Sequence, residues 1–259
     1  MRRWNFHFAI IRAVACLLVI AIHVSNLYNR AFPEIGIGSY GIALLVNSIA
    51  RVSVPLFFML SGALLAGRKP DIHKSIHRVW KFLWITVLWV AFYLAWTRVY
   101  LKQPYDFRML LSVPPSTHLW FLYAILAIYL ALPLIQTLTR AMDDSLELHI
   151  WMLVLLGVSV GGQYILSFTP LHGKYDIPLA HGTYFGLFFL GYFLYEQRAL
   201  IRFRVHTRTL WQVFIGCTVL NAMLTGGASI KQGVHNEHFF EYRSPLIILA
   251  SAAAFVLLS

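Results

Sequence analysis

The stretch FAIIRAVACLLVIAIHVSNLYN at residues 8–29 decides the fold class of this chain. Apart from Arg12 and His23, it contains only apolar and uncharged polar side chains. A helix needs about 20 predominantly apolar residues to cross the roughly 30 Å hydrocarbon core of a bilayer. Residues 8–29 are therefore predicted to form a transmembrane helix.

Similar apolar stretches recur along the whole chain of 259 residues. They cover residues 41–66, 79–100, 117–138, 148–168, 182–201, 209–226 and 244–259. Hydrophobic residues make up 59% of the sequence and charged residues 12%, whereas soluble proteins carry about 25% charged residues. This composition excludes a soluble globular enzyme, a disordered chain and a coiled coil. We expect one integral-membrane domain over residues 1–259, an all-α polytopic transmembrane helix bundle of about eight spans.

The charged residues predict how the bundle is oriented. The net charge is +11, which in a soluble protein would suggest nucleic-acid binding. Here the Lys and Arg residues lie mostly in short loops between apolar stretches, as expected for a protein whose partner is the lipid bilayer, so no nucleic-acid partner is expected. A cytoplasmic N-terminus places thirteen of the 21 basic residues on the cytoplasmic side and seven on the outer side. The positive-inside rule therefore favours a cytoplasmic N-terminus.

Arg12 and His23 are predicted to share one face of the first span. They are 11 positions apart, and 11 steps of about 100° bring a helix back to within about 20° of the same direction, roughly 16 Å further along its axis. An arginine suits a phosphate group because its planar fork donates two parallel hydrogen bonds. A histidine suits proton transfer because its pKa lies near neutral pH. Spacing alone leaves a second interpretation open, in which Arg12 extends to the membrane surface and His23 bonds a neighbouring carbonyl.

Arg51 is a second ionisable residue inside an apolar stretch. No Asp or Glu lies deep in any predicted span, so this cation needs carbonyl groups, water or an anionic ligand. Pro55 follows one turn later and leaves the carbonyl of Arg51 without its helical donor, which predicts a kink. Asn47 precedes Arg51 by one turn on the same face. Ser61 and Gly62 make the inner half of this span slim, for close helix packing or for the passage of a thin ligand.

Polar residues also gather at the ends of the predicted spans. The first cytoplasmic loop and the start of the third span carry the basic residues Arg68, Lys69, Lys74, Arg78 and Lys81, which set the topology or hold a phosphate-rich ligand near Arg12. His73 and His77 lack a third ligand, so no metal site is expected. His118 and Trp120 begin the fourth span, as interface residues or as a wall of a site near His23. A polar outer surface without assignable roles comprises His172, Lys174, Asp176, His181, His235, Glu237, His238, Glu241 and Arg243.

Four motifs in order resemble the membrane-bound acyltransferase 3 family. They are the R-x10-H pair Arg12–His23, RVSVPLFFMLSG at 51–62, HKSIHRVWK at 73–81 and HLWFLYAILAIYLALPLIQ at 118–136. The resemblance implies a bundle of about ten helices, so the C-terminal spans of the family are missing from the eight predicted here. It also implies transfer of an acyl group, usually acetyl from acetyl-CoA, to a hydroxyl of a glycan or lipid-linked sugar. His23 is then catalytic, and Arg12 with the basic loop binds CoA.

The resemblance thus implies an acetyl-CoA-dependent O-acetyltransferase of the bacterial inner membrane. In this hypothesis the arm of acetyl-CoA passes Ser61, and Arg51 holds negative charge that develops during transfer. Asn47, His118 and Trp120 are expected to contact the acceptor. A transporter of glycans or small molecules, an inactive truncated homologue and a homo-oligomer all remain compatible with the sequence.

Overall fold

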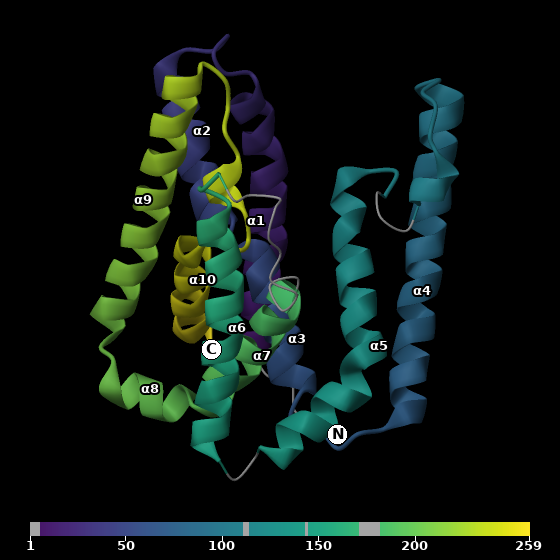
Figure 1. The fold of residues 1–259 in the computed structure, drawn as a ribbon, viewed down its shortest axis with the longest axis vertical. Helices are drawn as coiled ribbons and strands as arrows, with labels where there is room; N and C mark the ends of the chain where they lie inside the picture. The colour runs from purple at the N-terminus through teal and green to yellow at the C-terminus, as the bar shows by residue number, and fades with distance from the viewer. Residues whose placement is uncertain (1–5, 111–113, 143–144, 171–181) are drawn as a thin grey trace. The chain divides into compact units, whose positions relative to one another are not determined.

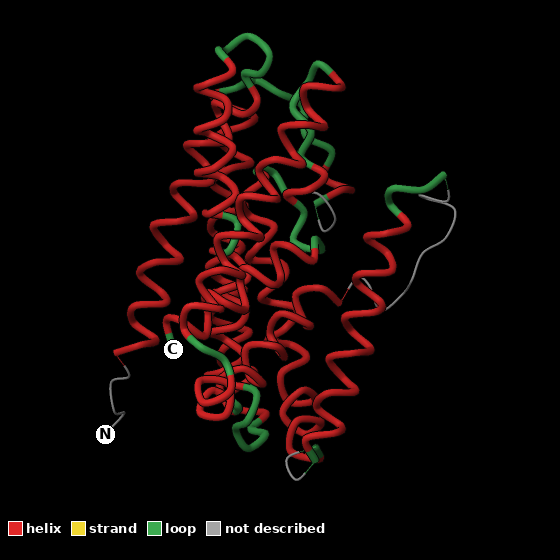
Figure 2. The backbone as a smooth tube through the Cα atoms, turned by 90° about the vertical axis from the view of Figure 1, so that its left-hand side faces the viewer, coloured by secondary structure: helices red, strands yellow, loops and turns green. Residues whose placement is uncertain are grey.

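The computed structural model describes residues 6–110, 114–142, 145–170 and 182–259. Over these ranges every regular element is a helix, which confirms the all-α prediction (Figures 1 and 2). The chain divides into two compact units, one formed by Met1–Ala66 with Ser145–Ser259 and the other by Gly67–Asp144.

The first unit, called the main unit here, contains most of the helices. They are α1 (Phe6–Arg30), α2 (Ile37–Ala50), α3 (Ser53–Leu65), α6 (Leu146–Leu166), α7 (Thr183–Glu196), α8 (Arg198–Arg204), α9 (Thr207–Gln232), the 3-10 turn η5 (His238–Phe240) and α10 (Pro245–Leu258). The second unit, called the hairpin unit, has two long helices, α4 (Ile72–Ala95) and α5 (Trp120–Ala141), which pack against each other. It also contains the short elements η1 (Trp96–Tyr100), η2 (Phe107–Met109) and η3 (Thr117–Leu119).

Seven of the eight predicted spans are confirmed within the described residues as helices long and apolar enough to cross a membrane. The prediction for 182–201 is wrong. The helix there, α7, has 14 residues and ends at Glu196, and the chain turns through Gln197 into the short α8. Fourteen residues rise about 21 Å, less than the thickness of the hydrocarbon core. The consecutive polar residues at 196–198 explain why the apolar helix ends there.

The second span is interrupted where Pro55 predicts a kink. Helix α2 ends at Ala50, Arg51 and Val52 form a turn, and α3 begins at Ser53. Proline has no backbone N–H to donate to the carbonyl of Arg51. The interruption therefore comes from the sequence itself, and it places Arg51 at a junction between two helices.

Helices α3 and α7 lie side by side with their backbones in close contact (Figure 1). A Cβ atom added to Gly62 would overlap the carbonyl oxygen of Phe188, and one added to Gly191 would overlap the backbone of Met59. The large side chains Phe58, Phe188, Phe189 and Phe255 are fully buried around this contact. Of the two interpretations of Gly62, close helix packing is confirmed.

Candidate functional site

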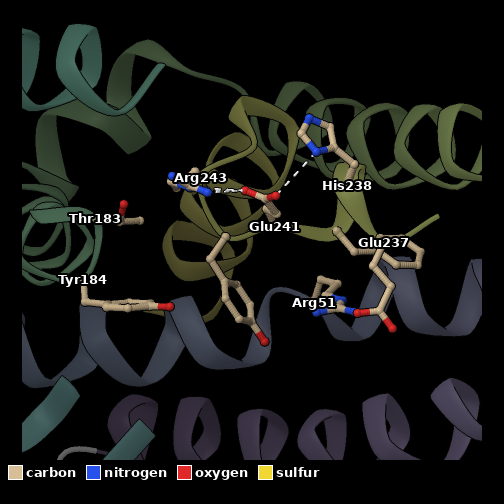
Figure 3. A pocket seen from close by; sticks show the side chains of 9 residues that line it. Arg51, Thr183, Tyr184, Glu237, His238, Glu241 and Arg243 are labelled. Atoms are coloured by element: carbon tan, nitrogen blue, oxygen red, sulfur yellow. Dashed lines mark hydrogen bonds and ion pairs between the residues drawn. The ribbon is translucent and has the colours of Figure 1, made fainter. Parts of the chain in front are cut away.

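The main unit contains an open cavity of about 740 Å³ (Figure 3). Three segments far apart in the sequence supply its walls: the turn between α2 and α3, the first turn of α7, and η5 with the residues before α10. The lining residues are Arg51, Thr183, Tyr184, Glu237, His238, Phe240, Glu241, Tyr242 and Arg243. This volume lies within the range of pockets that bind small molecules, and the lining combines aromatic rings with charged groups.

Arg51 is held in place by uncharged groups. Its Nε donates to Oδ1 of Asn47 at 2.9 Å, and its guanidinium carbon lies 4.8 Å from the ring centroid of Phe240. Asn47 is completely buried and donates in turn to Oγ of Ser25 on α1, also at 2.9 Å. The Ser25 hydroxyl donates to the carbonyl of Ala21 at 2.7 Å. This chain of hydrogen bonds fixes the guanidinium against α1 and aims it at the cavity.

The other charged groups of the cavity each have a charged or imidazole partner, and two of these pairs are drawn in Figure 3. Nη2 and Nε of Arg243 donate to Oε2 of Glu241 at 2.8 and 3.2 Å. The other carboxylate oxygen of Glu241 lies 3.4 Å from Nδ1 of His238, whose Nε2 is 3.0 Å from Oγ of Ser167. Glu237 accepts from Nε of Arg30 at 3.3 Å. Each carboxylate of the cavity therefore has a cationic or imidazole partner.

Helix α1 is unbroken through Arg12 and His23, as the spacing argument requires. Both side chains are exposed. Measured around the axis of a regular helix, they lie roughly 100–120° away from the centre of the buried face of α1. Arg30, seven residues after His23, falls on the same stripe two turns further on. Arg30 pairs with Glu237, which lines the cavity, whereas neither Arg12 nor His23 lines it, so a shared site of these residues stays a prediction.

Comparison with known proteins now adds the family. The sequence matches the family described as "acyltransferase domain", acyltransferase 3, over residues 8–259. The chain belongs to this family. No curated protein and no solved structure gives a match. The protein is therefore a multi-pass membrane acyltransferase, and the family membership favours an enzyme over the transporter interpretation.

The predicted CoA-binding cluster of this acyltransferase lies in the hairpin unit. Its basic residues are Arg68, Lys69, Lys74, Arg78 and Lys81, all of them exposed except the half-buried Arg78. Asp71 caps α4 and pairs with Nζ of Lys74 at 2.6 Å; this hydrogen bond lowers the pKa of Asp71. Lys74, Arg78 and Lys81 thus lie in the N-terminal part of α4, and Arg68 and Lys69 lie in the loop before it. The closeness of this cluster to Arg12 stays a prediction.

His118 and Trp120, predicted to contact the acceptor, also lie in the hairpin unit. The His118 ring packs on Tyr93 of α4 at 4.8 Å, and its Nδ1 lies 3.0 Å from Oγ of Ser116. Trp120 begins α5 with its ring beside Phe121. Their role near His23 stays a prediction. Asn47, by contrast, does not line the cavity. Its side chain is fully buried and accepts a hydrogen bond from Arg51.

Sequence reasoning found Arg51 but missed most of the cavity. Thr183 and Tyr184 carry no signal, because nothing in the sequence indicates that α7 starts beside Arg51. The charged residues at 237–243 are close together in the sequence, which predicts a polar outer surface there but assigns them no roles. Four members of that surface, His172, Lys174, Asp176 and His181, lie outside the described residues.

Proposed function

We propose that this acyltransferase moves an acetyl group from cytoplasmic acetyl-CoA to a hydroxyl of a surface-polysaccharide or lipid-linked sugar. Within its family the sequence resembles the inner-membrane O-acetyltransferase of enterobacterial common antigen, which supports a bacterial inner-membrane location with a cytoplasmic N-terminus. The observation that carries the proposal is the unbroken helix α1, on which Arg12, His23 and Arg30 share one stripe and Arg30 pairs with Glu237 of the cavity.

At the cytoplasmic end of the stripe, Arg12 and the basic cluster at 68–81 bind the phosphates of acetyl-CoA. Guanidinium groups recognise phosphates through paired, charge-assisted hydrogen bonds. The pantetheine arm follows α1 towards His23, with Ser61 of α3 on its path. The hydroxyl of Ser61 already donates to the carbonyl of Phe57 at 2.8 Å and keeps its lone pairs for a polar group of the arm.

At the outer end, the cavity holds the acceptor sugar. Its aromatic rings offer faces for the sugar, and its carboxylates accept hydrogen bonds from hydroxyls. His23 takes the proton of the acceptor hydroxyl as the oxygen attacks the thioester carbonyl. The carbon–sulfur bond then breaks, and the CoA thiolate receives the proton. Arg51 offsets negative charge on the acceptor side.

The test is acetyl transfer in membranes that contain the full chain, labelled acetyl-CoA and a glycolipid acceptor. His23→Ala should lower the rate by a factor of about 10² to 10⁴, the usual contribution of a general base, while the protein stays folded. Arg12→Ala should weaken CoA binding more than His23→Ala does. His206→Ala is the matched control, because His206 is exposed at the start of α9.

Transfer at the wild-type rate by His23→Ala would contradict the proposed chemistry. Movement of the glycan across the membrane without acetylation would favour the transporter instead. Binding of acetyl-CoA without transfer would favour an inactive homologue.

A further inference from the structure

Counting Arg30, which pairs with a lining acid without lining the cavity itself, three arginines stand against two glutamates at the cavity. Glu237 is paired with Arg30 at 3.3 Å and Glu241 with Arg243 at 2.8 Å, so each acid is matched by its own cation. Arg51 is left over. Among the residues that the structure describes, no acid lies within ion-pair distance of its guanidinium group.

The partners of Arg51 are all uncharged. They are the amide of Asn47, the hydroxyl of Tyr242 and the ring of Phe240. These groups orient a guanidinium but do not neutralise it. Arg51 also lies within a membrane-spanning segment and is only partly exposed, where an unneutralised cation is costly and is usually matched by an anion.

We propose that the acceptor of this acyltransferase carries an anionic group, a carboxylate or a phosphate ester, which the guanidinium of Arg51 binds. The identification of this ligand as the acceptor rests on the proposed function. A planar guanidinium binds either group through two parallel hydrogen bonds. The anion then supplies the charge that the cavity lacks.

The remaining lining fits the rest of such a sugar. Glu237 and Glu241 present carboxylate oxygens, which accept hydrogen bonds from sugar hydroxyls, and the ring of Tyr184 also lines the cavity (Figure 3). With one cation in excess and two paired acids, the cavity favours an acidic sugar over a neutral one. It also disfavours an amino sugar with a free ammonium group.

Binding is measured without acetyl-CoA, on the full chain in nanodiscs of neutral phosphatidylcholine. The probes are methyl glucuronide, its neutral methyl ester, methyl glucoside and glucose 1-phosphate, compared by saturation-transfer NMR. We expect the charged probes to bind at least about tenfold more tightly than the two neutral ones, since hydrogen bonds between charged groups are stronger than those to neutral groups. Tighter binding of the glucuronide assigns a carboxylate, and tighter binding of glucose 1-phosphate assigns a phosphate ester.

Variants assign this preference to one side chain. Arg51→Gln should abolish it, and Arg51→Lys should retain part of it, because a lysine keeps the charge but not the fork. Lys231→Gln is the charge-matched control, since Lys231 is exposed in the last turn of α9. Equal affinity of the wild-type protein for the glucuronide and its methyl ester would overturn the proposal even if Arg51→Gln did not fold. A preference that survives Arg51→Gln would also overturn it.

The two proposals fail separately in this design. Preferential binding of charged probes with no acetyl transfer in the complete assay would contradict the proposed function alone. Acetyl transfer to neutral and charged acceptors with equal efficiency would contradict the anionic acceptor alone.

Discussion

At the scale of single residues, the site depends on how an arginine is held inside a membrane protein. The sequence shows Arg51 in an apolar stretch without a nearby acid and predicts that it needs carbonyls, water or an anion. In the structure, Arg51 is hydrogen-bonded to Asn47, which is in turn hydrogen-bonded to Ser25 of α1. A guanidinium fixed by a buried amide does not have to reorient when a ligand binds, which lowers the entropic cost of binding.

His235 predicts a pH dependence of stability. It lies between α9 and η5, with Nδ1 2.9 Å from the hydroxyl of Tyr40. Burial lowers its pKa below the ordinary value of 6.5, and the nearby charges are Glu237, Arg51 and Arg30. The unfolded chain therefore binds this proton more readily, and stability falls as the pH drops through about 6.5. We expect a lower thermal unfolding midpoint in detergent at pH 5.5 than at pH 7.5.

The difference between the two midpoints should shrink in His235→Gln. His206→Gln, at an exposed histidine, should leave it unchanged. If His235→Gln kept the full wild-type difference, the pH dependence would belong to other groups.

At the scale of elements, some features follow from the local sequence and others depend on tertiary contacts. Pro55 interrupts the second span for a reason contained in its own chemistry, so sequence alone places the junction that carries Arg51. The role of Gly62 depends on a neighbouring helix, because its lack of a side chain matters only where the backbone of α7 packs against it. The same contact explains the mistaken span at 182–201: α7 is apolar because it is buried against α3, whatever its length.

The contact between α3 and α7 predicts sharp sensitivity to small substitutions. Gly62→Ala and Gly191→Ala place a Cβ atom on backbone atoms of the opposite helix, which cannot move as a side chain can. Overpacking commonly costs 1–3 kcal/mol, and a backbone clash should cost about 3 kcal/mol or more. Both variants should lose several degrees of thermal midpoint, or the monodisperse peak altogether, in fluorescence-detected size-exclusion chromatography. Gly157→Ala on α6 meets no atom within 4 Å and should be neutral or slightly stabilising.

At the scale of the whole molecule, the chain is a multi-pass membrane acyltransferase with two compact units. The main unit contains the α1 stripe and the cavity, and the hairpin unit contains the basic cluster and His118. The proposed reaction needs a donor from one side of the membrane and an acceptor from the other. The orientation of the chain is therefore a central expectation, and the distribution of Lys and Arg predicts it.

Single cysteines test this orientation. In a background that lacks the two free cysteines, Cys16 and Cys217, exposed positions are replaced one at a time. A membrane-impermeant maleimide added to spheroplasts should label Lys102→Cys, because this position follows the third span and is predicted to lie outside. Lys69→Cys and Arg140→Cys, predicted to be cytoplasmic after the second and fourth spans, should react only after the membrane is opened. The reverse pattern would place the N-terminus outside and remove the basic cluster from cytoplasmic CoA.

Sequence by itself determined the all-α membrane class, the positions of seven spans, the interruption at Arg51 and the Arg12–His23 stripe. Hydrophobicity, helical period and proline chemistry are local properties, and a short stretch contains all the information that they need. Only the tertiary structure decided that α7 is a short buried helix and that Arg51 lies in one cavity with the segment at 237–243. The pairing of Arg30 with Glu237 joins residues 207 positions apart, and it depends on how helices pack, which no local pattern specifies.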